Sequence, residues 1–255
     1  MISIKNPIQI QKMRDSGKIL YDALQETILH VKSGVSTKEL DHVADKYICR
    51  YGKPAFKGYE GFPAALCTSV NDTVVHGIPS YKEVLKDGDV ISLDCGVLLD
   101  GWYSDSAITV GVGEISQEAK DLIEYTEKSF FEGARKAIAG ARLGDIGAAV
   151  SMCVAPKNYG VVRDLTGHGI GKDLHEEPSI YNFGTAGKGS RIYKGMTICI
   201  EPMITSGTWK VYMTEDDGWN IKTQDGSLSS HYEHTLLIRD GLPELLTYPG
   251  FEWKE

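Results

Sequence analysis

The chain has 255 residues, of which 42% are hydrophobic, and its formal net charge is −8 at pH 7. This length and apolar content are enough for one large domain with a sizeable core, and we expect residues 1–255 to form a single domain because no linker divides them. The excess of acidic residues leaves no broad basic surface, which argues against nucleic-acid binding as the main task.

Cysteine usage and the first residues indicate the compartment. The chain has five cysteines, an odd number, dispersed and without a C-x-x-C pair, which favours neither a disulfide framework nor a zinc finger. Residues 1–31 lack the apolar block of a signal peptide, and no later run has the length of a membrane span. We therefore expect a cytoplasmic protein with reduced cysteines and no membrane association.

Four helices are predicted as scaffold. Asn6 and Pro7 are typical of an N-cap followed by a first-turn proline. The apolar residues that follow lie on one helical stripe: Leu20, Leu24, Ile28 and Val31. Ser36 and Glu39 fit a capping box, and they predict a second amphipathic helix that ends before Gly52. Further helices are expected at about 116–139 and 145–154, with strands in much of the remainder.

A β-hairpin is predicted between the second and third helices. Residues 90–97 alternate so that one face is apolar and Asp94 lies on the other face with Ser92. Asp100-Gly101 is a preferred dipeptide of a two-residue turn, and residues 102–110 form the returning strand. This register places Asp94 opposite Ala107 and one diagonal step from Asp105, on the same face.

The two hairpin carboxylates allow two interpretations. At roughly 5 to 8 Å, the spacing of such neighbours, Asp94 and Asp105 repel each other unless cations neutralise them. The alternative is that both are solvated acids on the wet face of an edge hairpin, as antiparallel sheets often have. Taken alone, this pair is compatible with either interpretation.

Three further residues favour the metal site. His168 lies among three glycines in residues 165–171, where a helix is disfavoured and the backbone can closely approach an ion or substrate. Glu201 lies in the apolar run 196–203 and Glu233 in the alternating run 232–238, where an unpaired charge costs several kcal/mol. A lone histidine or one buried acid is usually structural, but together with the hairpin pair these residues predict two divalent metals.

At this point the sequence resembles the type I methionine aminopeptidases. The match runs from about Pro7 to the end of the chain, with eight family motifs in the same order. They lie at residues 67–71, 75–79, 92–94, 104–106, 166–171, 175–178, 200–203 and 232–235. The resemblance implies an α+β architecture, the pita-bread fold of the creatinase and aminopeptidase enzymes, in which a pseudo-two-fold antiparallel sheet is covered by helices.

The resemblance also assigns metal-binding roles. It makes Asp105 and Glu233 the carboxylates that bridge two metals, with Asp94 completing the shell of one metal and His168 and Glu201 that of the other. Ligands of this kind suit cobalt, manganese, iron, zinc or nickel, so the physiological metal stays open.

Other residues match substrate-binding and catalytic positions of the family. His76 and His175 correspond to two histidines that contact substrate, and Glu201 is expected to move a proton. The pocket for the methionine side chain would be formed by Tyr59, Phe62, Cys67 and Trp219. The chain departs from the family at Phe62, where tyrosine is common, and at Leu174, where phenylalanine is common.

The implied function is removal of the N-terminal methionine from nascent proteins and peptides when the second residue is Gly, Ala, Ser, Thr, Pro, Val or Cys. A hydroxide bridging the two metals would attack the scissile carbonyl. We expect a monomer whose partners are nascent polypeptide N-termini, with the ribosome a further candidate. Two alternatives remain: a proline-specific aminopeptidase of the same fold, which usually has an additional N-terminal domain, and a non-catalytic peptide-binding module, which typically loses metal ligands.

Overall fold

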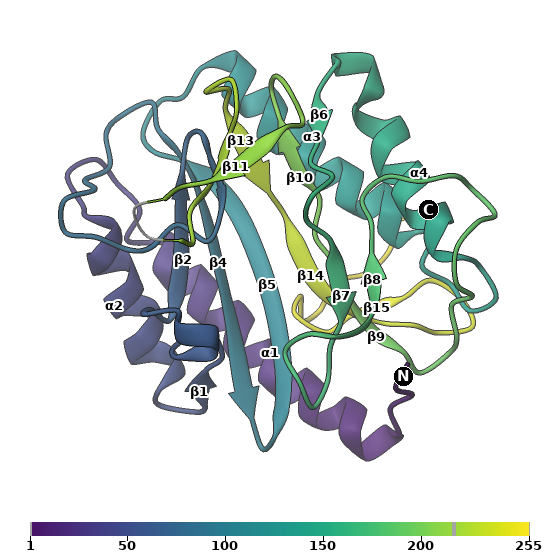
Figure 1. Ribbon diagram of the computed structural model, residues 1–255. Helices are drawn as coiled ribbons and strands as arrows, with labels where there is room; N and C mark the ends of the chain where they lie inside the picture. The colour runs from purple at the N-terminus through teal and green to yellow at the C-terminus, as the bar shows by residue number, and fades with distance from the viewer. Residues whose placement is uncertain (1, 216–217, 255) are drawn as a thin grey trace.

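The computed structural model describes residues 2–215 and 218–254, so Met1 and Glu255, the ends of the expected domain, lie outside the described residues. The described helices and strands form an α+β fold in which helices pack on a large antiparallel sheet (Figure 1). The helices are α1 (Pro7–Ile28), α2 (Thr37–Ile48), α3 (Gln117–Ala134) and α4 (Leu143–Val154), with 3₁₀ turns at Tyr59–Gly61 and Ala155–Lys157. No helix in the described part of the chain is long and apolar enough to cross a membrane.

The large sheet has the strand order β1-β4-β5-β14-β9-β7-β8, with β2 also paired to β4 and β15 to β14. Its strands are β1 (Lys53–Pro54), β2 (Leu66–Val70), β4 (Val90–Leu99), β5 (Trp102–Gly111), β7 (Gly167–Gly169), β8 (Glu176–Ile180), β9 (Thr197–Ile200), β14 (Glu233–Leu237) and β15 (Glu244–Leu245). Two small sheets complete the fold: β13 (Ser229–His231), β10 (Met203–Thr205) and β6 (Gly160–Val161), and β11 (Val211–Met213), β12 (Ile221–Thr223) and β3 (Thr73–Val75).

The predicted starts of the first three helices are confirmed by their caps. The Asn6 side chain accepts from the Gln9 amide, Ser36 forms the predicted capping box with Glu39, and Ser116 caps α3. Each cap satisfies backbone N–H groups that have no partner inside the helix.

One predicted helix end, that of the third helix, was wrong. The first helix ends at Ile28, so Val31, the last residue of the predicted stripe, lies outside it, and the fourth begins at Leu143, close to the predicted start at about 145. The third ends at Ala134, five residues before 139: the Lys136 and Ala137 amides donate only three residues back, to Gly133 and Ala134, and the Ala139 amide then donates to the Arg239 carbonyl oxygen. Apolar periodicity continues past this end, since Ala137 is fully buried, but the tertiary hydrogen bond replaces the helical one.

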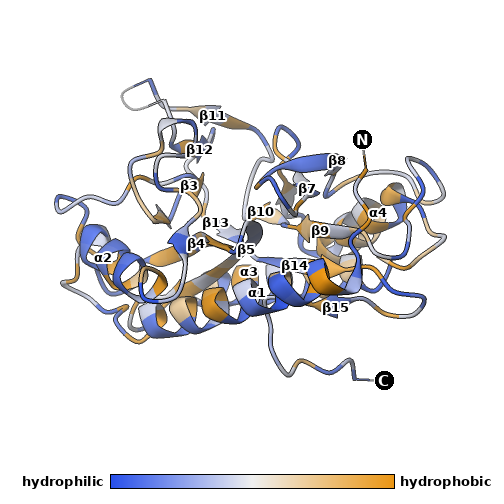
Figure 2. Ribbon diagram, turned by 90° about the horizontal axis from the view of Figure 1, so that it is seen from below, coloured by the Kyte–Doolittle hydropathy of each residue, from blue (hydrophilic) through white to orange (hydrophobic). Residues whose placement is uncertain are grey.

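The helices cover one face of the large sheet, and the opposite face is left for polar residues. Helices α1 and α2 pack on β2, β4 and β5. Helix α3 contacts β9, β10 and β13, and α4 packs on α3 (Figure 2). The apolar face of β4 packs in the core against α1 and α2, through Ile91, Leu93, Cys95 and Val97. Because side chains alternate along a strand, Asp94 projects from the other face, as predicted.

Candidate active site

Three carboxylates come from three adjacent strands of the large sheet. Asp94 on β4 pairs with Ala107 on β5, and Glu233 on β14 pairs with the same Ala107 from the other side. Asp105 precedes Ala107 by two residues, so its side chain lies on the same face. Asp94, Asp105 and Glu233 are 8%, 3% and 2% exposed, so the alternative of solvated acids on a wet sheet face is wrong.

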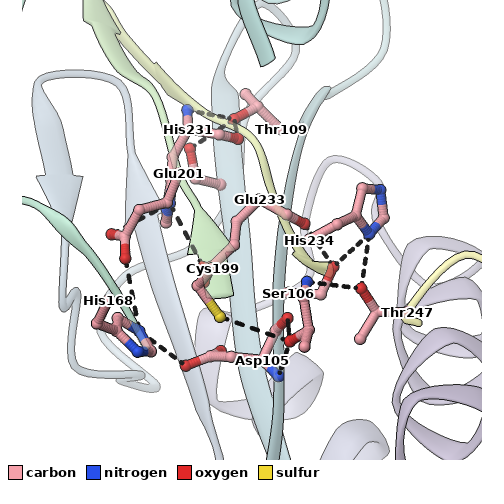
Figure 3. A network of polar contacts seen from close by, with 12 residues as sticks. Asp105, Ser106, Thr109, His168, Cys199, Glu201, His231, Glu233, His234 and Thr247 are labelled. Atoms are coloured by element: carbon pink, nitrogen blue, oxygen red, sulfur yellow. Dashed lines mark hydrogen bonds and ion pairs between the residues drawn. The ribbon is translucent and has the colours of Figure 1, made fainter. Parts of the chain in front are cut away.

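Glu201 and His168 approach this cluster from the other half of the sheet. Strand β9 ends at Ile200, so Glu201 follows the strand and does not lie within it, and its carbonyl oxygen accepts from the Asn182 amide group at 2.9 Å. His168 is the central residue of β7, and its Nε2 lies 3.6 Å from Glu201 Oε1 and 3.9 Å from Asp105 Oδ2 (Figure 3). The structure therefore brings all five predicted metal ligands together.

The glycines beside His168 have a structural reason that the sequence did not reveal. A Cβ at Gly167 would lie 2.3 Å from the Cys199 carbonyl oxygen, and one at Gly169 would lie 2.3 Å from the Glu177 carbonyl oxygen. Such distances are impossible for real side chains, so only glycine lets β7 pack between β9 and β8. The close approach seen here is between neighbouring strands, and it holds the imidazole in place.

Burial and mutual repulsion perturb the carboxylates. Burial raises the pKa of Asp94 to about 7, and burial followed by the neighbouring carboxylates raises the pKa values of Asp105, Glu201 and Glu233 well above their usual range. One oxygen each of Asp94, Asp105 and Glu233 is buried without a hydrogen-bond partner. Buried oxygens without partners are costly, and a bound cation would satisfy them. The residues present therefore fit a divalent metal.

His168 is oriented as a metal ligand would be. Its Nδ1 donates to the Gly169 carbonyl oxygen at 2.9 Å, which directs the lone pair of Nε2 toward the carboxylates. Burial, followed by the neighbouring His175, lowers the pKa of His168 to about 3. The ring is therefore neutral at pH 7 and able to bind a metal.

The two predicted substrate histidines lie at the edge of the cluster. His76 has a φ of 60°, a left-handed conformation that is unusual for a residue other than glycine and often marks functional sites. Burial and then His175 lower the pKa of His76 to about 4. The His175 ring packs edge-on against His168 with 4.4 Å between ring centroids, and its Nδ1 lies 3.0 Å from the Tyr59 hydroxyl.

An apolar pocket lies against the carboxylates. Cys67 pairs with Asp94 across β2 and β4, which joins the pocket directly to the cluster. The Phe62 and Trp219 rings meet edge-on at 5.2 Å, and the Trp219 ring is 6.1 Å from that of His76. Every predicted site residue lines this cavity, whose other walls come from Phe56, Glu60 and Leu174.

A second, more open cleft meets the pocket at the carboxylates. It shares His76, Asp94, His168, His175 and Glu201 with the apolar pocket. Its remaining walls are largely polar: Val75, Asp164, Leu165, Thr166, Glu176, Glu177, Ser179, Met203 and His231. A peptide with its first side chain in the apolar pocket could continue along this cleft, with its first peptide bond over the carboxylates.

His231 is a further residue at the cluster, and it is not among the residues predicted from sequence. This residue is buried beside Glu201 and Glu233, and it lies two positions before Glu233 in the chain. That spacing of two in an extended segment was the available signal, because alternate residues share a face. It was overlooked because the apolar pattern used to assign the strand begins at Tyr232.

The buried cluster is a candidate metal site, and similarity to known proteins defines the class of the chain, a metallopeptidase. Residues 11–240 match the model of Metallopeptidase family M24. A methionine aminopeptidase from Clostridium acetobutylicum is 49% identical over 248 residues, which cover 97% of this chain and 99% of that protein. The crystal structure of a methionine aminopeptidase from Rickettsia prowazekii is 39% identical, with a TM-score of 0.95 over 97% of this chain and 100% of that one.

The chain belongs to the methionine aminopeptidases of metallopeptidase family M24. Its α+β pita-bread fold and its dependence on divalent metal are those of the family. A prolidase from Pyrococcus furiosus shares the fold with a TM-score of 0.77, but it is 21% identical and the chain covers 66% of its length. The expected enzyme class is thus confirmed, and the proline-specific alternative is supported by fold alone.

Proposed function

We propose that the chain removes the N-terminal methionine of peptides and nascent polypeptides when the second residue is Gly, Ala, Ser, Thr, Pro, Val or Cys. Cleavage after an N-terminal methionine follows from the chain's membership of the methionine aminopeptidases. The observation that best supports the choice of bond is the junction of an apolar pocket with an open polar cleft at the carboxylate cluster. With the first side chain in the pocket, the bond after the first residue would lie at that junction.

Two divalent ions would be held by the cluster. Asp105 and Glu233 lie centrally and would be shared, Asp94 would bind one ion, and His168 and Glu201 the other. When bound, such ions supply an activated water and polarise the scissile carbonyl. Cobalt, manganese, iron, zinc and nickel all suit this ligand set.

The protein's own groups position the substrate and move protons. The Glu201 side chain is 13% exposed and lines both the apolar pocket and the cleft, and we assign it the transfer of a proton to the leaving amine. His76 and His175 flank the cluster as neutral imidazoles, so each can donate one hydrogen bond, to the peptide nitrogen or to the carbonyl oxygen.

The apolar pocket would bind the methionine side chain through Tyr59, Phe62, Cys67 and Trp219. A thioether gains roughly 0.3 to 1.5 kcal/mol from contacts with aromatic rings, which favours methionine over other apolar side chains. Phe62 and Leu174 keep this wall apolar where the family commonly has tyrosine and phenylalanine, so we expect the same substrate with altered pocket shape.

We further propose that residues 1–255 act as one catalytic domain, as a monomer in the cytoplasm, on N-termini emerging from the ribosome. Co-sedimentation with ribosomes tests a contact with the ribosome, and a protein that stays in the supernatant at all salt concentrations would contradict it.

Peptide hydrolysis tests the main proposal. Peptides beginning Met-Gly should be cleaved after methionine by metal-loaded protein, and cleavage should stop when a chelator removes the metal. Peptides with another first residue and proline second should be cleaved poorly. A preference for the proline peptides would instead support the proline-specific alternative, and absence of any cleavage would support a binding module.

A further inference from the structure

His231 is a second imidazole at the carboxylate cluster. It is 2% exposed, and neither of its ring nitrogens has a hydrogen-bond partner among the described residues. Buried polar groups in folded proteins nearly always have a partner, so a ring without one calls for a specific explanation such as a bound ion. No other described histidine has a ring with both nitrogens buried and unpaired.

The backbone of His231 is fixed at the end of β13. Its amide donates to Thr109 Oγ1 at 2.9 Å, and the Thr109 hydroxyl donates to its carbonyl oxygen at 2.8 Å (Figure 3). His231 also pairs with Met203 on β10. Two neighbouring strands thus hold the backbone, and a ring on a rigid backbone is positioned as metal binding requires.

The ring faces the same carboxylates as the predicted ligands. His231 Nε2 lies 3.6 Å from Glu233 Oε2 and 3.9 Å from Glu201 Oε2. Both distances are too long for hydrogen bonds. They match the roughly 3 to 4 Å between two ligands that each lie about 2.1 Å from one ion.

Ligand atoms of Asp94, His231 and Glu233 all lie within 4.8 Å of one another. On the other side of the cluster, ligand atoms of His168 and Glu233 meet the same limit together with Cys199. Glu233 therefore lies between two groups that each contain an imidazole. A single ion could not bind both rings without moving one of them, whereas two ions could each take one.

We propose that His231 is a protein ligand of the ion on the Asp94 side of the cluster, together with Asp94 and Glu233. The inference rests on the proposed function, which places two ions here, and it adds a ligand to one of them. Each ion would then have one imidazole ligand, from His168 on one side and from His231 on the other.

An imidazole on the Asp94 side changes which ions bind there. A site of carboxylates alone suits magnesium or manganese, whereas a neutral nitrogen ligand favours zinc, cobalt, nickel or iron. Replacing His231 by Gln keeps a polar side chain but removes this ligand. We expect one of the two zinc-binding steps in H231Q to lose at least about tenfold in affinity, with the other step little changed.

Calorimetric titration of metal-free protein with zinc measures both steps. H231A serves as a second variant, and H42Q, which alters an exposed histidine outside the site, is the matched control. Thermal melting of the metal-free variants checks that they fold. Equal affinities of wild type and folded H231Q in both steps would overturn the proposal.

Cadmium-113 NMR tests the bond itself. In protein with ¹⁵N-labelled histidines and two equivalents of ¹¹³Cd, scalar coupling should split the ring nitrogens of two histidines, because coupling requires a metal–nitrogen bond. H231Q should lose one coupled ring and H168Q the other. If His231 only positions Glu201, its ring nitrogens would show no coupling to cadmium. A wild-type protein with a single coupled histidine, whose coupling is lost in H168Q, would refute the inference.

A peptide assay on the same protein distinguishes failure of the His231 assignment from failure of the proposed function. If two cadmium ions bind, a Met-Ala peptide is cleaved by zinc- or cobalt-loaded protein and His231 shows no coupling, then the ligand assignment fails and the proposed function stands. If the protein binds no second ion, the proposed two-metal site and the His231 inference fail together.

Discussion

Asp94 and Glu233 lie on either side of Ala107, the residue with which each of them pairs across the large sheet. The small methyl side chain of Ala107 leaves room above the sheet between the two carboxylates. Asp105, two residues before Ala107 on β5, projects from the same face of the sheet. The register of three antiparallel strands is thus sufficient to concentrate three negative charges on one face. This arrangement makes each carboxylate sensitive to the loss of its neighbours and of the metal.

The first prediction concerns Asp105, which we expect to be shared by two ions. Asp105→Asn keeps the shape of the side chain but removes a charge and a strong ligand, so metal content and turnover should fall together, with turnover reduced at least about a hundredfold. Elemental analysis and a Met-Ala peptide assay measure the two quantities. Asp100→Asn, in the exposed turn of the same hairpin, is the control and should change neither. Near-normal turnover with two bound metals in Asp105→Asn would refute the shared role.

The second prediction separates chemistry from metal binding. His76 lies beside the pocket wall at Trp219 and is not a predicted ligand. His76→Ala should therefore retain the wild-type metal content while turnover falls by about a hundredfold, the effect of losing one positioned hydrogen-bonding group. Both quantities can be measured on the same sample. If the metal is lost with His76, then that residue is a ligand and the division of roles is wrong.

The hairpin and its acidic pair could be predicted from sequence because the signals there are local. Alternation fixes the face of each residue and the Asp100-Gly101 turn fixes the register, so the pairing of Asp94 with Ala107 follows without tertiary information. The capped helix starts were predicted for the same reason. The grouping of the five ligands required more than local signals, and it was inferred from the cost of burying unpaired charges and from the family resemblance.

The remaining features depend on contacts between distant segments. Beyond the end of α3, the Ala139 amide donates to the Arg239 carbonyl oxygen, a contact that no helical pattern contains. The glycines at 167 and 169 serve strand packing, which becomes visible only when Cys199 and Glu177 are placed against them. His231 lies in a short strand of a different sheet from Glu233, so the pattern that identified Glu233 began one residue too late to include it.

The third prediction concerns metal removal and pH. In the metal-free protein the folded-state pKa of Asp94 is raised to about 7, and those of Asp105, Glu201 and Glu233 are raised as well. Unfolded carboxylates titrate near about 4, so these carboxylates hold more protons in the folded state than in the unfolded state from about pH 4 upward. Buried histidines such as His168 and His76, whose pKa values are lowered to about 3 and about 4, act in the opposite direction, but only up to about pH 6.5, so the carboxylates dominate in the window above that pH. The free energy of unfolding of metal-free protein should therefore fall as pH rises through this window.

Thermal melting in a chelating buffer checks the sign. The metal-free protein should melt at least about 2 °C lower at about pH 7.5 than at about pH 6.5, the shift expected for about 1 kcal/mol in a protein of this size. Metal-loaded protein should not show this loss, because bound cations stabilise the ionised carboxylates. Asp94→Asn removes one of the repelling groups and should reduce the pH dependence. A metal-free protein more stable at the higher of these two pH values would contradict the argument.

The last prediction is about substrate choice. The apolar pocket ends at Cys67 and Trp219 beside the carboxylates, so the first side chain should be selected by shape and by sulfur contacts with the aromatic walls. Leucine in first position should be hydrolysed poorly. At the second position, a large side chain should be rejected because overpacking a rigid site costs about 1 to 3 kcal/mol, or roughly 5- to 150-fold in specificity constant. Met-Ala and Met-Leu peptides of equal length provide the measurement, and a Leu-Ala peptide isolates the first position. Similar specificity constants for Met-Ala and Met-Leu would rule out a cramped second site and leave the pocket for methionine as the only source of selectivity.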